Sequence, residues 1–369
     1  MRHYLNDSFR FRPWLLVLLY VDTVVLTNPS CPKTSDELGC PCFKFESGIF
    51  VECTKTTKFS INNVLKLLPH TIKSLTIYDL DRSVTSITKD FFPNGTKIVN
   101  LQISQNNIKQ LSDDAFEELR TSLESLSIVA AKLDQIPEKA LARLGLLRSL
   151  DLESNEIVQI PNYSFYRLKL NKLTMKNNTL EQISEYAFAG LEKTLIELDL
   201  SENKLISFPM ISFRHLENLQ WLRLSRNGIG SIPNDDDSEL TSVHFLDLSS
   251  NNFVTLDCDA FRKLPSLRTL SLYFNNIETV DKLAFTSLNI LESIDLSHNK
   301  IVSVDSSTFC SNVKLKTIDL SHNHVHYIDG VFKNLPELKE LNLSENNILH
   351  IPSSAFTNSS RLTVIHLQQ

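Results

Sequence analysis

The apolar residues of this chain follow a phrase, L-x-x-L-x-L-x-x-N-x-L, that returns every 23 to 26 residues. One clear copy runs from Leu147 to Ile157 and carries its asparagine at Asn155. Self-similarity at a fixed period is the signature of a repeat protein, in which each unit stacks only on its neighbours. Twelve full copies, and a thirteenth cut short at the end of the sequence, begin at Ile72, Ile98, Leu123, Leu147, Leu170, Leu195, Leu219, Val243, Leu267, Leu291, Leu315, Leu338 and Leu362.

The x-x-L-x-L part of each copy alternates apolar and polar residues, which predicts a half-buried β-strand. Its apolar side chains face inward and stack on those of the next copy, and its polar side chains share the outer face of one parallel sheet. The remainder of each copy returns the chain on the opposite side. The pattern therefore predicts an α/β solenoid with a parallel β-sheet on one face and short helical or irregular segments on the other.

Two further columns recur at fixed places in the repeat. At the ninth position an asparagine stands where the chain leaves the strand, and a buried amide there can satisfy both a backbone donor and a backbone acceptor. Leu80 and Ala131 interrupt this column, and we expect looser packing there. Later in the repeat a small residue precedes phenylalanine; such a row could line a ligand slot, but the burial habits of phenylalanine favour a core column. The phenylalanines are Phe116, Phe165, Phe188, Phe213, Phe261, Phe285, Phe309 and Phe356.

The N-terminal residues have the features of a targeting segment. Three arginines precede an apolar run, Trp14 to Val21, that is too short to span a bilayer. We therefore expect a signal peptide over residues 1–27 rather than an uncleaved anchor. No later stretch of the sequence is long and apolar enough to span a membrane.

Cysteine usage agrees with export. Four cysteines cluster after the apolar run, and in an oxidising compartment such a cluster is normally a disulfide staple. Their spacing allows three pairings and lacks the C-x2-C pair of a common zinc site. Cys258 and Cys310 lie two copies apart, at about 9.6 Å between strands, so we expect two buried free thiols. The clustered cysteines are Cys31, Cys40, Cys42 and Cys53.

These residues resemble the typical extracellular class of leucine-rich repeat, a curved horseshoe with its parallel sheet on the concave face. The spacing C-x8-C-x-C-x10-C is similar to that family's N-terminal cysteine cap, and the resemblance implies the pairs Cys31–Cys42 and Cys40–Cys53. It also implies a cap over residues 28–71 and a repeat array over 72–369. The segment from Leu195 to Pro209 resembles chaoptin-like adhesion proteins and the repeat-only subunit of a secreted luciferase, and in general form Slit, Toll and proteoglycan ectodomains. The C-terminal cysteine cap of the family is missing, so we expect a chain cut short after Gln369.

Most outward-facing strand positions are Ser, Thr, Asp, Glu, Lys or Asn, but the seventh to ninth copies differ. They offer clustered aromatic and arginine side chains, which dominate the energetics of protein interfaces. The alternative is local packing between strands. Carboxylates bracket these copies, among them Glu197, Glu202 and Glu292, and can steer a basic partner. The predicted partner-binding residues are Trp221, Arg223, Arg226, His244, Phe245, Arg268, Tyr273 and Phe274.

Three other patterns carry weaker hypotheses. His298, His322 and Glu345 share the eighth position of successive copies, but a line of side chains spaced by about 4.8 Å suits metal coordination poorly, and we expect no metal. A pH-sensitive surface is the alternative there. The run Asp235 to Asp237 lacks the glycine and distal glutamate of a calcium loop, so we expect a solvated bulge. Predicted glycosylation sites are Asn94, Asn162, Asn177, Asn342 and Asn358.

The formal net charge of -6 argues against a nucleic-acid partner, because phosphate binding needs a basic face. Sequence motifs for a nucleophile elbow, a zinc helix or a phosphate loop are missing, so we expect neither enzyme activity nor a cofactor. The sequence thus predicts an extracellular module that binds a protein or glycoprotein, a second copy of itself included, in adhesion or matrix interaction. The alternatives are a signalling-receptor ectodomain and a non-catalytic subunit of a secreted enzyme.

Overall fold

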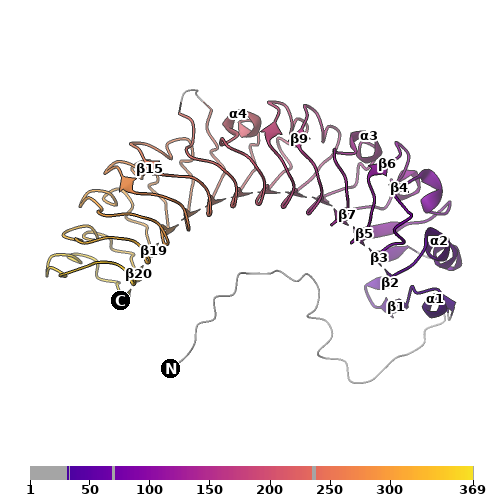
Figure 1. Ribbon diagram of the computed structural model, residues 1–369, viewed down its shortest axis with the longest axis horizontal. Coiled ribbons are helices and arrows are strands. Elements are labelled where there is room, and N and C mark those ends of the chain that lie inside the picture. The colour runs from indigo at the N-terminus through magenta and orange to yellow at the C-terminus, as the bar shows by residue number, and fades with distance from the viewer. Residues whose placement is uncertain (1–30, 33, 69–70, 235–237, 369) are drawn as a thin grey trace, which may run out of the picture.

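The computed structural model describes residues 31–32, 34–68, 71–234 and 238–368, which form an open arc (Figure 1). One 15-stranded sheet lines the inner side of the arc, and its strand order follows the sequence throughout. The short helices lie on the outer side (Figure 1). The predicted signal peptide and the run Asp235 to Asp237 lie outside the described residues. None of the helices in the described ranges is long and apolar enough to cross a membrane.

Each copy of the phrase contributes one strand at the predicted place, so the solenoid is confirmed. All neighbours in the array pair in parallel with leucine or isoleucine in register, as Leu246 does with Leu222 and Leu270. These central residues are buried in every strand of the array except β21, where Ile365 is 37% exposed, and the flanking residues face the open side of the sheet. The strands are β3 (Ile72–Tyr78), β5 (Ile98–Ser104), β7 (Ser125–Val129), β8 (Ser149–Asp151), β10 (Lys172–Thr174), β12 (Glu197–Asp199), β13 (Trp221–Arg223), β14 (Phe245–Asp247), β16 (Thr269–Ser271), β18 (Ser293–Asp295), β19 (Thr317–Asp319), β20 (Glu340–Asn342) and β21 (Val364–His366).

A small cap covers the N-terminal end of the sheet. It consists of α1 (Thr34–Glu37), β1 (Cys42–Phe45), β2 (Gly48–Thr54) and α2 (Lys58–Leu67). Strand β1 pairs antiparallel with β2 and so covers its free edge. Disulfides join Cys31 to Cys42 and Cys40 to Cys53, the pairs that the family resemblance implied.

The asparagine column forms a hydrogen-bonded ladder between repeats. Asn299 is typical: its Nδ2 donates to the carbonyl oxygens of Leu272 in the preceding repeat and Leu296 in its own, both at 3.0 Å. Its Oδ1 accepts the N–H of Ile277 at 3.0 Å. Asn106 differs, because its Oδ1 accepts from Ile108 of its own repeat and its Nδ2 has no partner among the described residues. The asparagine ladder comprises Asn155, Asn178, Asn203, Asn227, Asn251, Asn275, Asn299, Asn323 and Asn346.

The two residues that interrupt the asparagine column are buried. Leu80 is 1% exposed and Ala131 is 8% exposed. Looser packing at these two positions stays a prediction. An apolar side chain at this position adds to the stacked leucines, because the column already points inward.

The phenylalanine column fills the outer half of the core, as expected. The rings of Phe285 and Phe309 stack at 5.7 Å between centroids, and Phe332 extends the stack although valine replaces the small residue before it. Short helices carry the chain past this column: η1 (Lys89–Phe91), η2 (Glu117–Leu119), α3 (Glu138–Leu141) and α4 (Met210–Phe213).

The two remaining cysteines, Cys258 and Cys310, are free but exposed, which corrects the expectation of buried thiols. They lie in the irregular outer segments rather than in the inward columns. Partial desolvation and the nearby carboxylates of Asp259 and Asp281 raise the pKa of Cys258.

Proline restricts where a second ribbon forms on the outer side. Three short pairs occur: β4 (Ser86–Ile87) with β6 (Gln110–Leu111), β9 (Gln159–Ile160) with β11 (Gln182–Ile183), and β15 (Thr255–Leu256) with β17 (Thr279–Val280). In each pair the residue after the second strand donates its N–H backwards, as Ser184 does to Ile160 at 2.9 Å. Proline has no N–H to donate, so copies with proline there do not join the preceding copy. Those prolines are Pro137, Pro161, Pro209, Pro233 and Pro352.

Candidate partner-binding site

The predicted binding residues lie on β13, β14 and β16 or next to them, on the concave face. They form two separate clusters. Trp221, Arg223 and Phe245 lie together at the level of the strands, whereas Tyr273 and Phe274 lie just beyond the end of β16. His244 and Arg268 precede their strands and join neither cluster. Arg268 instead pairs with Glu292, at 2.7 Å between Nη1 and Oε1.

Part of the first cluster already makes contacts within the chain. Trp221 lies directly between Glu197 and Phe245 in register and remains 40% exposed. Arg223 places its guanidinium carbon 5.3 Å from the Phe245 ring centroid and donates to Glu197 Oε1 at 2.6 Å. Lys172 approaches the same carboxylate at 3.2 Å. Local packing between strands, the alternative interpretation, therefore accounts for Arg223 and for one face of Phe245.

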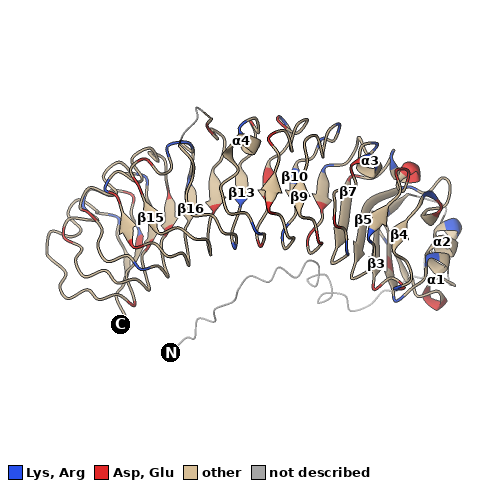
Figure 2. Cartoon of the chain, turned by 45° about the horizontal axis from the view of Figure 1, so that its top comes forward, with Lys and Arg blue, Asp and Glu red and all other residues tan. Residues whose placement is uncertain are grey.

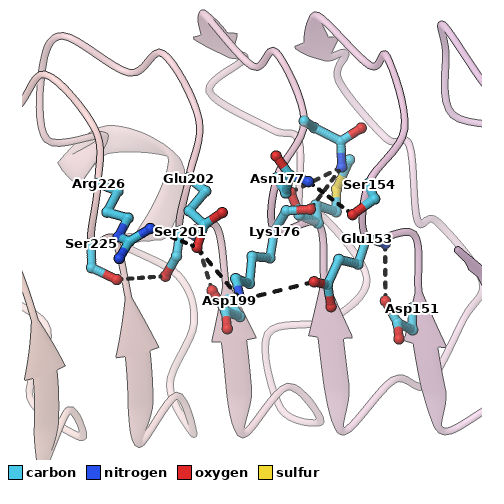
Figure 3. Close-up of polar contacts among 12 residues, drawn as sticks. Asp151, Glu153, Ser154, Lys176, Asn177, Asp199, Ser201, Glu202, Ser225 and Arg226 are labelled. Atoms are coloured by element: carbon cyan, nitrogen blue, oxygen red, sulfur yellow. Dashed lines mark hydrogen bonds and ion pairs between the residues drawn. The ribbon is translucent and has the colours of Figure 1, made fainter. Parts of the chain in front are cut away.

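A chain of charges continues from this cluster toward the N-terminal strands (Figure 3). Lys176 points between two carboxylates, with Nζ 3.8 Å from Glu153 and 3.6 Å from Glu202. Arg226 contacts the other side of Glu202, also at 3.6 Å. Burial raises the pKa of Glu153, and the Lys176 ammonium only partly opposes that shift. These side chains form ion pairs with one another. Arg226, like Arg223, therefore contacts a glutamate of the same chain.

Lys and Arg residues are interspersed with Asp and Glu residues along the arc (Figure 2). This distribution follows from the repeat, which sets acids and bases on neighbouring strands at the same level. Glu202 between Lys176 and Arg226 is one example, and Glu292 between Arg268 and Lys316 is another.

The second cluster is larger than predicted, because two histidines extend it. The Tyr273 and His298 ring centroids are 5.1 Å apart, those of Phe274 and His298 are 6.3 Å apart, and the His298 and His322 rings stack at 4.0 Å. We call these four side chains the aromatic row. The sequence pattern indicated the two histidines only as part of a candidate metal site or a pH-sensitive surface. The shared eighth position of Phe274, His298 and His322 was the signal that could have joined them to the aromatic residues.

The backbone at the eighth position is left-handed in every one of these repeats. The φ angle is 55° at Phe274, 55° at His298 and 52° at His322. Bulky side chains are disfavoured in this region, which asparagine tolerates better. Asn177 occupies the equivalent position of an earlier repeat with a φ angle of 53°. Phe274 is nevertheless 58% exposed, so burial gives little compensation for this conformation.

Replacing Phe274 with asparagine is therefore expected to change the free energy of unfolding by no more than about 0.5 kcal/mol. The lost ring contacts to Tyr273 and His298 are offset by a residue that suits the left-handed backbone. Urea unfolding followed by circular dichroism measures the effect. A loss above about 2 kcal/mol would mean that the ring is part of the fold rather than available to a partner.

The histidine column shows no metal-binding geometry. Among the residues that the structure describes, no group of three or more His, Cys, Asp and Glu side chains could hold a metal ion. Burial, and then the neighbouring ring of His322, lower the pKa of His298, while Asp295 and Asp319 oppose the shift.

The predicted glycosylation sites lie in two settings. Asn94, Asn162, Asn177 and Asn358 are exposed. Asn342 lies half-buried in β20, where its Nδ2 donates to Asp319 Oδ2 at 2.9 Å and its Oδ1 accepts from Ser344. Glycosylation at all five positions stays a prediction.

Comparison with known proteins finds repeats of one kind along nearly the whole chain. The family model "Leucine rich repeat" matches residues 169–229, 265–325 and 325–369. The model "BspA type Leucine rich repeat region (6 copies)" matches residues 30–146 and 70–194, and "Leucine Rich repeats (2 copies)" matches residues 241–285.

Curated relatives share the repeats at moderate identity. Tsukushi of Xenopus tropicalis is 29% identical over 217 residues, which cover 56% of this chain and 59% of the relative. Chaoptin of Drosophila melanogaster is 34% identical over 102 residues, which cover 27% of this chain and 8% of the relative. The chain thus spans less than two thirds of the length of these relatives.

Among solved structures, the Toll–Spatzle complex of Drosophila aligns with a TM-score of 0.64 at 18% identity. The alignment covers 92% of this chain and 60% of the other. At this identity the likeness concerns the curvature and stacking of the repeats.

Proposed function

Because this chain belongs to the leucine-rich-repeat family, we propose that it binds another protein through its concave face, in cell adhesion or matrix interaction. The observation that carries the proposal is the set of exposed aromatic side chains on the open sheet. Trp221, Tyr273 and Phe274 are each at least 38% exposed, on or next to strands of the open sheet. Aromatic residues grouped in this way are typical of binding surfaces.

The chain is an extracellular protein. Its cap is held by two disulfides, which persist in oxidising compartments. Relatives such as Tsukushi and chaoptin are likewise secreted or cell-surface leucine-rich-repeat proteins. The partner proposed here is accordingly an extracellular protein or glycoprotein, with a second copy of the chain as one candidate.

Binding without catalysis is the proposed role. Acids and bases on the concave face recur at the same level on successive strands and pair along a line, as Lys172, Glu197 and Arg223 do. Catalysis instead needs side chains of different kinds to converge on one reacting atom.

The proposal is tested with beads coated with the secreted protein. The concave variant carries Trp221→Ser, Phe245→Ser and Phe274→Ser. The matched control carries Tyr163→Ser, Tyr166→Ser and Tyr186→Ser, three exposed aromatic residues that lie outside the concave strands and contact one another. We expect wild-type and control beads to cluster together, or to bind the same cell surfaces, while the concave variant does not. Equal binding by the two variants would contradict the proposal.

A further inference from the structure

Two carboxylates beside the aromatic row lie on adjacent strands and lack the cationic partner that several glutamates on this face possess. Glu197, Glu202 and Glu292 each pair with a lysine or an arginine of the chain. Asp295 and Asp319 lie directly opposite each other on β18 and β19, and no Lys or Arg of the described residues forms an ion pair with either. Like charges directly opposite on neighbouring strands destabilise a sheet, and a cation between them relieves the repulsion.

The hydrogen bonds of these carboxylates leave room for such a cation. Asp295 Oδ1 accepts the N–H and the hydroxyl of Ser297 at 2.9 and 2.6 Å, and Asp319 Oδ1 accepts the same two groups from Ser321. Asp319 Oδ2 accepts from Asn342, whereas Asp295 Oδ2 has no hydrogen-bond partner within the described ranges. One carboxylate oxygen of the pair is therefore free to accept from a ligand.

The aromatic row provides the second part of a cation site. His298 follows Asp295 by three residues, and both Asp295 and Asp319 interact electrostatically with its ring. Tyr273 and Phe274 lie on one side of His298, and His322 stacks on the other. Aromatic faces attract cations, and they do so more strongly next to carboxylates.

We propose that the aromatic row, together with Asp295 and Asp319, binds an arginine side chain presented by the protein partner. This inference rests on the proposed function and names the chemistry that the partner brings. A guanidinium is flat enough to stack on the exposed ring of Tyr273 or Phe274 while its N–H groups point to Asp295. Lysine presents a compact charge without a face that can stack, so the site favours arginine.

Lowering the pH should weaken the binding of an arginine side chain at this site. The groups that face His298 are Tyr273, Phe274, His322, Asp295 and Asp319, and Glu345 follows His322 at the next eighth position. The pKa of His298 is lowered, so its ring is neutral at neutral pH and gains charge only below the ordinary histidine range. Burial raises the pKa of Asp295, so its negative charge is lost at a higher pH than for an ordinary aspartate. Both changes oppose a bound cation as the pH falls.

The test uses Nα-acetyl-arginine methylamide as the probe and the secreted protein as the receptor. Histidine ring signals in NMR spectra report the site, with His298 and His322 assigned through His→Gln variants. We expect saturable shifts of these two signals at neutral pH, with a dissociation constant about tenfold lower than that of the uncharged citrulline analogue. The difference should shrink as the pH falls below the ordinary histidine range.

The chain offers a matched pair of variants. Asn342 stands at the position of Asp319 in the next repeat and makes the same bonds to Ser344, so asparagine suits this site. Asp295→Asn with Asp319→Asn should therefore fold normally and lose the preference for arginine. Asp247→Asn with Asp199→Asn removes the same charge from β14 and β12, outside the aromatic row, and should retain the preference.

Each outcome bears on one of the two proposals. Equal binding of the arginine and citrulline probes, or equal loss in both double variants, overturns the arginine site. If that happens while the concave serine variant still fails to bind on beads, the protein-binding role stands without it. If the arginine preference is found but the serine variant binds normally, the site exists and the proposed role fails.

Discussion

Replacing Asn299 with alanine is expected to lower the free energy of unfolding by about 4 kcal/mol. The side chain is buried, and its amide bonds three carbonyl oxygens, of Leu272, Leu296 and Ser297. Its oxygen accepts the N–H of Ile277. Alanine removes four hydrogen bonds, each of which contributes about 1 kcal/mol, and it leaves the N–H of Ile277 buried without a partner. The three carbonyl oxygens each keep one other donor, from Asn275, Asn323 and the N–H of Phe274. Urea unfolding followed by circular dichroism measures the loss.

Asn106→Ala provides the control for this prediction. Asn106 belongs to the same column and is buried to a similar degree, but it makes only the bond from Ile108 to its Oδ1. We expect its replacement to cost about 1 kcal/mol. Equal losses at the two positions would show that filling the column with side-chain volume matters more than the bonds between repeats.

Replacing Phe285 with alanine is expected to lower the free energy of unfolding by about 4 kcal/mol. The ring is fully buried and stacks between Phe261 at 5.8 Å and Phe309 at 5.7 Å. Its removal takes one unit out of the stack and leaves a cavity that two rigid neighbours cannot close. Urea unfolding and the thermal midpoint both measure the effect.

The contrast with Phe274 checks the interpretation of both phenylalanines. Phe274→Asn, which is expected to be nearly neutral, replaces a phenylalanine of the same repeat that lies on the exposed concave side. A large loss at Phe285 together with a small one at Phe274 separates the core column from the binding face. A small loss at Phe285 would mean that the stack can rearrange around the missing ring.

Those features of the fold that recur in every repeat could be predicted from the sequence. The strand positions follow from the spacing of leucines such as Leu246 and Leu270, because a shift by one residue would place the apolar set on the open face. The asparagine ladder and the phenylalanine column follow for the same reason. A residue that returns at one place in each repeat meets the same neighbours each time.

Contacts particular to one repeat could not be predicted in this way. Cys258 and Cys310 were placed in the core, but they lie in outer segments whose path varies between copies. Arg223 and Arg226 were predicted as partner-binding residues, and the contact of each with a glutamate near a neighbouring strand was not foreseen. Such pairings depend on side-chain reach across strands, whereas the period fixes only the level of each residue.

The asparagine ladder also determines how this protein responds to tension. Each asparagine of the ladder forms hydrogen bonds with its own repeat and with the preceding one. When one repeat is pulled from the array, the backbone of the preceding repeat therefore loses hydrogen bonds. The array should therefore give way one repeat at a time, and each step frees roughly 80 Å of contour length from about 24 residues. A chain that links two surfaces can in this way lengthen in steps and dissipate a pull without releasing its partner.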